Sequence, residues 1–248
     1  MCRGGHLPSV GTMTNTKNAV ITGASRGLGL ALARGLAAEG WSLVIDARDG
    51  EALGTAAASL PRGTHVIALP GDIADPAHRA ALRDAADDLG GPDLLINNAG
   101  TLGTSPLPPI SDYPIAHLRA AFEVNVLAPI ALTQLLLPAL RARGGAVLSI
   151  TSDAAVEPYA GWGGYGAAKA ALEQASNVLA AEENVVRVWW VDPGDMRTHM
   201  HQQAYPGEDI SDRPLPDGVV PAFLRLITER LPAGRYRAAE LMPTGARP

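Results

Sequence analysis

Residues 19–29 read AVITGASRGLG, and a stretch rich in alanine and leucine follows them. The aliphatic run 19–22 predicts a short strand, and the pattern over 27–39 predicts a helix. Glycines at 23, 27 and 29 permit a tight turn and let the backbone approach a pyrophosphate, whose charge the helix N-terminus attracts. The stretch therefore predicts a nucleotide phosphate cradle; the plain alternative is a glycine-rich turn between a strand and a helix.

Short apolar runs alternate with helical patterns along the rest of the chain. This order predicts βαβ units and a Rossmann-like doubly wound α/β fold, with a parallel sheet flanked by helices on both faces. Ligands then bind outside the carboxyl ends of the strands. Predicted strands cover 19–22, 42–46, 64–69, 93–96, 146–150 and 185–191, and predicted helices cover 27–39, 50–59, 76–89, 113–141 and 163–183.

Several segments depart from this alternation. Residues 1–16 predict a flexible lead-in, which leaves 17–248 as a single domain. The proline-rich stretch 192–217 predicts a lid over the substrate, with an ordinary surface excursion as the alternative. Within the longest helix, Pro129 and Pro138 predict a kink or a break.

Composition narrows the class of protein. Apolar residues make up 47% and charged residues 18%, which is typical of a globular chain. A formal net charge of −5 gives no reason to expect nucleic acid or an anionic membrane as a partner. The only cysteine is Cys2, and neither a secretory leader nor an apolar run of about 18 residues is present. We therefore expect a cytoplasmic protein.

Further motifs follow the glycine turn along the chain, most of them directly after predicted strands, with Asn125, Tyr165 and Lys169 in predicted helices. They are Gly71-Asp72-Ile73, Asn97-Asn98-Ala99-Gly100, Asn125, Ser152, Tyr165 with Lys169, and Pro193-Gly194. Together with the TGxxxGxG pattern at 22–29, this series resembles the short-chain dehydrogenase/reductase family over roughly residues 18–198. The resemblance implies a nicotinamide cofactor, a carbonyl or alcohol as the small-molecule substrate, and a homo-oligomer. The tail, in which 234–241 predicts an edge strand, departs from the usual family pattern. This departure weakens the expectation of a homo-oligomer.

The resemblance also assigns cofactor contacts. Asp72 and Ile73 would meet the adenine, Thr198 the nicotinamide amide, and Asn98 a ribose, although Asn98 could equally brace neighbouring strands. The full set of cofactor residues is Gly23, Ser25, Arg26, Gly27, Leu28, Gly29, Arg48, Asp72, Ile73, Asn98, Ala99, Gly100, Tyr165, Lys169, Pro193, Gly194 and Thr198.

Two arginines bear on the choice between cofactors. Counted by the family's spacing, the position that would carry an acid for NAD falls on Ala47, and Arg48 follows it. Arg26 adds a second cation inside the glycine turn. Guanidinium groups suit a 2′-phosphate, so NADP(H) is preferred and NAD(H) stays possible. The alternative is that both arginines are solvated and that Asp46 binds the ribose.

Tyr165 and Lys169 share one face of a helix because they are four residues apart. A nearby ammonium lowers the pKa of a phenol and makes it a usable acid–base group. By the resemblance, Ser152 holds the substrate oxygen, with Thr151 and Ser149 as chemical alternatives, and Asn125 completes a proton relay unless it is only structural. The sequence predicts no metal site, because His199 and His201 have no further ligands at a recognisable spacing.

These assignments predict an oxidoreductase that transfers a hydride between NADP(H) and a carbonyl or alcohol, with Tyr165 as general acid and base. A nucleotide-binding regulator or scaffold without turnover is the main alternative. An epimerase or dehydratase acting on a nucleotide sugar is a third, and it usually needs a larger C-terminal domain than 248 residues allow. The expected substrate pocket is formed by Leu102, Ala154, Tyr159, Trp162 and residues 195–215.

Overall fold

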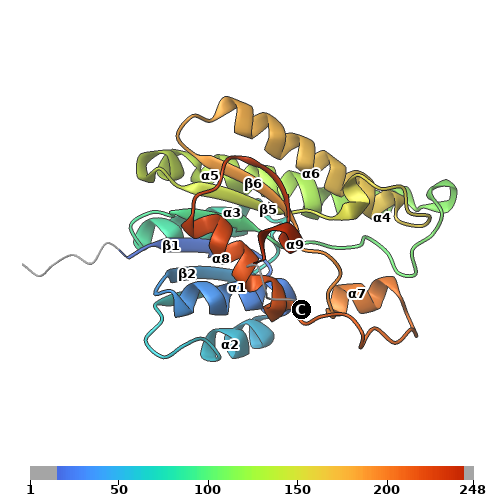
Figure 1. Cartoon of the computed structure of the whole chain (residues 1–248), viewed down its shortest axis with the longest axis horizontal. Coiled ribbons are helices and arrows are strands. Elements are labelled where there is room, and N and C mark those ends of the chain that lie inside the picture. Colours follow the sequence, from blue (N-terminus) through green and yellow to red (C-terminus); the bar gives the residue numbers. More distant parts are fainter. Residues whose placement is uncertain (1–15, 243–248) are drawn as a thin grey trace, which may run out of the picture.

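The computed structural model describes residues 16–242, and within them seven strands form one parallel sheet. The strand order is β3-β2-β1-β4-β5-β6-β7, so the winding direction reverses beside β1 and β4 (Figure 1). The doubly wound, single-domain fold is confirmed. The strands are β1 Asn18–Ile21, β2 Ser42–Ala47, β3 Val66–Pro70, β4 Leu94–Asn97, β5 Ala146–Ile150, β6 Arg187–Asp192 and β7 Gly234–Arg237.

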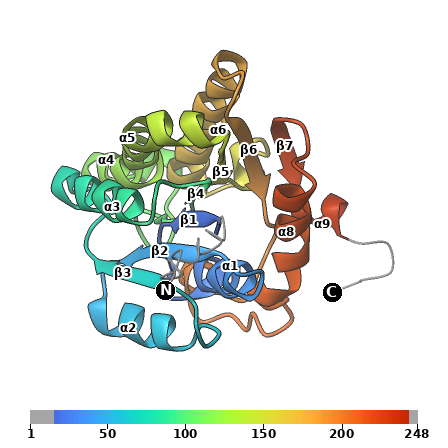
Figure 2. The same cartoon turned by 90° about the vertical axis from the view of Figure 1, so that its left-hand side faces the viewer.

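Helices cover both faces of the sheet. Figure 1 shows α1, α2 and α8 on one face and α3, α5 and α6 on the other, and Figure 2 shows the same two layers from the side. The helices are α1 Gly27–Ala38, α2 Gly50–Ala58, α3 Pro76–Asp88, α4 Ile115–Phe122, α5 Ala128–Arg143, α6 Gly163–Glu182, α7 His199–Ala204, α8 Val220–Thr228 and α9 Ala238–Leu241. Shorter turns occur at Ile110–Asp112, Asp153–Ala155 and Pro216–Val219.

The strands divide their side chains between two hydrophobic cores. In β1, Ala19 and Ile21 join the core under α1 and α8, whereas Val20 joins the core under α3 and α5. Adjacent side chains of a strand point to opposite faces, so a strand buried on both faces needs apolar residues at every position. This explains why the strands read as unbroken aliphatic runs.

The predicted helix over 113–141 is interrupted just before Pro129, one of the two prolines at which a kink or a break was predicted. A π-helical turn, Glu123–Leu127, separates α4 from α5. Pro129 has no N–H with which to close an i→i−4 bond to the Asn125 carbonyl, so the helical hydrogen-bond ladder changes at this point. The second proline, Pro138, lies inside α5, which continues past it.

The same helical run, Ile115–Arg143, is long and apolar enough on composition to cross a membrane. In this fold Leu132, Leu136 and Leu140 are fully buried in the core between α5, α3 and the sheet. Its hydrophobicity is therefore explained by packing inside the domain.

Two segments extend beyond the carboxyl ends of the strands, where Figure 1 shows α7 and the connection after β4 projecting from the sheet. The segment 192–217 contains α7, which the sequence did not predict. The hydroxyl of Ser105 donates to the Gln203 carbonyl at 2.6 Å and so joins the two segments. The predicted edge strand in 234–241 is present as β7, shorter than expected and followed by α9. The predicted flexible lead-in lies almost wholly outside the described residues.

Candidate active site

A cavity of about 1110 Å³ lies along the carboxyl ends of the strands. One end is lined by Arg48, Asp72 and Ile73, and the other by Ser152, Tyr165 and the 192–205 segment. The glycine turn lies between these two ends. All predicted site residues line this cavity except Gly29 and Asn125, which lie behind its wall.

The glycine turn has the close packing that a dinucleotide cradle requires. A Cβ on Gly29 would lie 2.4 Å from the Gly23 carbonyl oxygen and 2.5 Å from Asn98 Nδ2. Asn98 donates from Nδ2 to the carbonyls of Thr22 at 2.8 Å and Gly23 at 3.1 Å. The turn is therefore braced against the end of β4, and the N-terminus of α1 faces the cavity. These residues fit a pyrophosphate at this position.

Asp46, at the end of β2, is buried and braces the same turn. One carboxylate oxygen accepts from the Gly23 N–H at 2.7 Å, and the other lies 3.0 Å from Nε2 of His78. Arg48 is exposed at the cavity edge, and Ala47 presents no polar group. These contacts of Asp46 were not predicted from the sequence, because His78 lies on a helix 32 residues further along the chain.

Asp72 and Ile73, predicted to meet the adenine, line one end of the cavity. Asp72 is exposed and accepts from the Ala74 N–H at 2.9 Å, whereas Ile73 is buried. Gly71 leaves room for the His78 ring, since a Cβ there would come within 2.2 Å of Nδ1. The pair Asp72-Ile73 therefore offers a polar and an apolar group at the cavity edge.

Ser152, Tyr165 and Lys169 come together from two segments. Ser152 follows β5, whereas Tyr165 and Lys169 lie on the first turns of α6. Lys169 Nζ is 5.6 Å from the centre of the Tyr165 ring and donates to the Ile150 carbonyl at 2.8 Å. The Ser152 hydroxyl donates to Oδ1 of Asp153 at 2.9 Å. The predicted phenol, ammonium and hydroxyl thus lie beside one cavity.

The titration of these groups follows mainly from burial. Burial raises the pKa of Tyr165 well above its ordinary value, the carboxylates of Asp153 and Asp192 raise it further, and a hydrogen bond with Ser152 lowers it. Burial lowers the pKa of Lys169 to about 8. We expected the ammonium to lower the pKa of the phenol; in this structure burial and the two carboxylates raise it instead.

Asn125 is buried in the π-helical turn, and its side chain pairs with the backbone of Thr101. The carboxamide oxygen accepts from the Thr101 N–H, and Nδ2 donates to the Thr101 carbonyl, both at 2.8 Å. A Cβ on Gly100 would lie 3.3 Å from Asn125 Oδ1 and 3.7 Å from Lys169 Nζ. Asn125 is therefore near Lys169, with its side chain engaged in holding the loop after β4.

The end of the cavity predicted to hold the nicotinamide is bounded by the residues that follow β6. The Gly194 N–H donates to Oδ1 of Asp192 at 2.9 Å, which turns the chain at Pro193. Thr198 caps α7 by accepting from the His201 N–H at 3.1 Å. A Cβ on Gly27 would lie 3.6 Å from Thr198 Cγ2, so the start of α7 packs beside the glycine turn.

The substrate end has aromatic walls. Leu102, Ala154 and Tyr165 form a small apolar cluster against which Trp162 and Met200 pack. The Trp162 ring meets the Tyr165 ring edge-on at 5.6 Å and the Tyr205 ring at 6.1 Å. Leu102, Ala154, Tyr159 and Trp162 line the cavity as predicted, whereas the predicted segment 195–215 lines it only as far as Tyr205. Asp153 is an addition that the sequence analysis did not single out. Asp153 had a sequence signal, because it directly follows Ser152.

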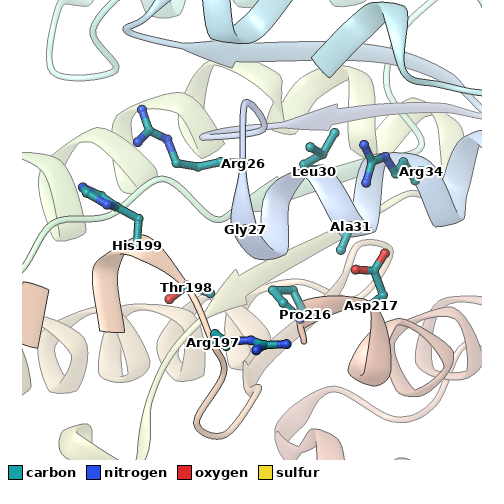
Figure 3. Close-up of a pocket in the computed structure, with 10 residues that line it drawn as sticks. All are labelled: Arg26, Gly27, Leu30, Ala31, Arg34, Arg197, Thr198, His199, Pro216 and Asp217. Carbon is teal, nitrogen blue, oxygen red and sulfur yellow. The ribbon is translucent and has the colours of Figure 1, made fainter. Parts of the chain in front are cut away.

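A second, smaller pocket of about 210 Å³ lies beside the outer surface of α1. Figure 3 shows Arg26, Arg34 and Arg197 around it, between α1 and the segments at 197–199 and 216–217. Arg26 lines both pockets, whereas Ser152, Tyr165 and Lys169 line only the larger one. Within the described residues, no group of three or more His, Cys, Asp or Glu side chains could hold a metal ion.

Residues 17–209 match the model of the short chain dehydrogenase family. The chain belongs to this family and is an oxidoreductase of the short-chain dehydrogenase/reductase type. It is 36% identical to serine 3-dehydrogenase of Rhizobium radiobacter over 183 residues, which cover 72% of each protein. It is also 36% identical to sepiapterin reductase of Bos taurus over 214 residues, which cover 81% of this chain and 80% of that protein.

Solved structures show the same fold. A short chain dehydrogenase from Shigella flexneri 2a str. 301, complexed with NADP, matches with a TM-score of 0.82 and 28% identity over 90% of this chain and 97% of the other. A 7α-hydroxysteroid dehydrogenase complexed with NADH and 7-oxo glycochenodeoxycholic acid matches with a TM-score of 0.80 and 29% identity, over 89% and 92% of the two chains. Structural neighbours thus include complexes with either nicotinamide cofactor.

Proposed function

We propose that the protein is an NADP(H)-dependent oxidoreductase that interconverts a carbonyl and an alcohol, with Tyr165 as the general acid and base. The observation that carries the proposal is the convergence of Ser152, Tyr165 and Lys169 on a cavity that also contains the glycine turn. When bound, the nicotinamide cofactor supplies or accepts the hydride.

The residues at the substrate end would handle the oxygen and its proton. In carbonyl reduction, the Tyr165 phenol donates a proton to the substrate oxygen while Ser152 holds that oxygen in place. The raised pKa of Tyr165 keeps the phenol protonated at neutral pH, which suits this direction. In alcohol oxidation the same group must first lose its proton, so this direction requires a higher pH.

Lys169 and Asn125 would connect the phenol to solvent. Lys169 Nζ lies over the Tyr165 ring, and a Cβ on Gly100 would be close to both Nζ and Asn125 Oδ1. With a pKa near 8, the lysine can exchange a proton close to neutral pH. A water between these groups would let Tyr165 regain its proton after each turnover. Asn125 would act chiefly through the loop that it holds.

The charged residues at the end of β2 and in the glycine turn support the preference for NADP(H). Both oxygens of Asp46 are engaged with Gly23 and His78, and the residue is 1% exposed, so it is poorly placed to accept from a ribose hydroxyl. Arg26 and Arg48 line the cavity and are exposed. A guanidinium group offers a charged, two-pronged donor to a 2′-phosphate.

Replacing Arg48 tests the cofactor preference. Arg48→Asp should weaken NADPH binding at least about 30-fold and leave NADH binding within about threefold, because only NADPH carries the phosphate. Fluorescence titration of both cofactors measures this, with exposed Arg62→Asp as the charge-matched control. An equal loss for both cofactors contradicts the assignment.

Replacing Tyr165 tests the reaction. Tyr165→Phe should bind NADPH as the native protein does and lose turnover roughly 10²–10⁴-fold in a panel of carbonyl substrates, since the proton donor is gone. Tyr236→Phe is the control, because its hydroxyl donates to the Pro232 carbonyl away from the cavity. Near-native turnover by Tyr165→Phe would assign proton transfer to another group.

A further inference from the structure

Asp153 places a carboxylate in the wall of the substrate cavity, next to the residue proposed to hold the reacting oxygen. It begins the Asp153–Ala155 turn, so its position follows from the end of β5. Oδ1 accepts from the Ser152 hydroxyl at 2.9 Å and from the Ala154 N–H at 2.8 Å, and Oδ2 accepts from the Tyr159 hydroxyl at 2.9 Å. All three donors are neutral groups.

The charge of Asp153 is therefore not offset by a neighbour. Within residues 16–242, no basic side chain forms an ion pair with it. Two other carboxylates line this end, and each has a basic neighbour. Asp195 lies 3.6 Å from Nε of Arg213 and 3.9 Å from Nδ1 of His201, and Asp192 lies 3.9 Å from Nη2 of Arg235. The carboxylate of Asp153 also raises the pKa values of the phenols of Tyr159, Tyr165 and Tyr205, which shows that its field covers this end of the cavity.

Aromatic rings surround the same space. Tyr159, Trp162 and Tyr205 line the cavity together with Asp153, and the Trp162 ring lies between those of Tyr165 and Tyr205. The face of an aromatic ring attracts a cation, and a carboxylate adds a charged hydrogen-bond acceptor. Oδ2 has one described donor and can accept another. A carboxylate within an aromatic wall is suited to a substituted ammonium group.

Two basic side chains near this end already have partners. Nε of Arg235 pairs with Glu173 at 2.9 Å, and its Nη2 donates to the Ser152 carbonyl at 3.3 Å. The other is Lys169. Its Nζ donates to the Ile150 carbonyl and lies over the Tyr165 ring. Burial lowers its pKa to about 8, which still leaves it mostly protonated at pH 7. Neither of these cations forms an ion pair with Asp153, so its carboxylate stays available to a cationic ligand.

We infer that the substrate carries a protonated amine, which Asp153 and the aromatic wall of Tyr159, Trp162 and Tyr205 recognise. Since Asp153 Oδ1 is 2.9 Å from Ser152 Oγ, the amine lies close to the reacting carbon, on the adjacent carbon or one further. The substrate class is then amino ketones and the corresponding amino alcohols. This inference rests on the proposed function, because it places the reacting oxygen at Ser152 and Tyr165.

Matched substrates test the inference. Aminoacetone and butan-2-one differ chiefly in an ammonium against a methyl group, and NADPH oxidation follows both. The native enzyme should favour aminoacetone in kcat/KM by at least tenfold at pH 7. In Asp153→Asn, which keeps the size of the side chain, that ratio should fall at least tenfold. Any effect of the substitution on the acidity of Tyr165 acts on both substrates and so cancels in the ratio.

The control variant is Asp212→Asn, because Asp212 is an exposed carboxylate outside the cavity and pairs with Arg213. It should leave the substrate ratio unchanged. Equal use of the two substrates by the native enzyme, or the same ratio in Asp153→Asn, overturns the inference.

A binding measurement separates this inference from the proposed reaction. Calorimetric titration of n-propylammonium into the NADP⁺-saturated protein requires no turnover. Binding should be detectable for the native protein and for Asp212→Asn, and at least tenfold weaker for Asp153→Asn. If no carbonyl compound is reduced but this pattern holds, the proposed function fails and the amine site stands. If carbonyls are reduced and n-propylammonium does not bind, the amine site is wrong.

Discussion

At the scale of single residues, the partners of each carboxylate decide its role. Asp46 lies near the end of β2, and Asp153 follows β5. Asp46 is buried and contacts the Gly23 N–H and His78. Asp153 lines the cavity, and its hydrogen-bond donors are neutral. Asp46 stabilises the glycine turn. The carboxylate of Asp153 raises the pKa of Tyr165.

Neutralising Asp153 should shift the pH dependence of alcohol oxidation. Burial is the largest cause that raises the pKa of Tyr165, and the charge of Asp153 is the next. In Asp153→Asn the second cause is lost, the pKa of the phenol falls, and the phenolate needed for oxidation forms at lower pH. The acidic limb of kcat/KM, measured with an uncharged secondary alcohol, should therefore move to lower pH. A limb that stays in place, or moves upward, contradicts this reading.

At the scale of elements, the junction of β1 with α1 depends on close contact. Gly23 adopts a φ of +68°, which favours glycine, and Gly29 lies against the Gly23 carbonyl and the Asn98 side chain. The π-helical turn before Pro129 is a second such junction, since it places Asn125 against the loop that follows β4. Local geometry at these junctions sets the shape of the cofactor cavity.

Two glycine substitutions should have opposite effects. Gly29→Ala puts a methyl group within 2.4 Å of a backbone oxygen, so unfolding should become easier by roughly 1–3 kcal/mol and NADPH binding should weaken at least tenfold. Gly54→Ala, in α2 with no atom near its Cβ, should stabilise the chain by about 0.5–1 kcal/mol and leave binding unchanged. Urea unfolding and fluorescence titration give the two values. A tolerated alanine at 29 would show that the turn is not packed as described.

At the scale of the whole molecule, β7 ties the end of the chain to the active site. Arg235 Nε donates to Oε1 of Glu173 at 2.9 Å, and its Nη2 donates to the Ser152 carbonyl at 3.3 Å. Glu173 in turn accepts from the Thr151 hydroxyl at 2.8 Å. The edge strand, α6 and the end of β5 are thus joined around the backbone of Ser152.

Removing this connection should affect both stability and turnover. Arg235→Met leaves Glu173 partly buried without its cation, which should cost on the order of 1–3 kcal/mol in the free energy of unfolding and lower kcat several-fold. Arg83→Met, which removes an exposed pair with the adjacent Asp84, should cost much less. Chemical denaturation and steady-state kinetics give both quantities. Equal costs for the two variants would mean that the Arg235 contacts contribute no more than a surface pair.

Much of the fold and of the candidate site could be predicted from local sequence patterns. Aliphatic runs indicated six of the seven sheet strands to within about two residues at each end, and the tail was expected to add the seventh. Ser152, Tyr165 and Lys169 were predicted from their spacing, and the structure brings them together. The helix α7 was missed because Pro193 and Pro206 lie close to both of its ends and make the whole segment look irregular.

The sequence by itself determined the alternation of strands and helices, the glycine turn and the pair Tyr165 and Lys169, because these depend on residue type and on spacings within one element. Only the tertiary structure decided that Asp46 accepts from the Gly23 N–H and contacts His78, and that Arg235 donates to the Ser152 carbonyl. It also decided that burial raises the pKa of Tyr165. Such properties arise between groups far apart in the chain, and their energies depend on distance and on exclusion of water, neither of which a local pattern contains.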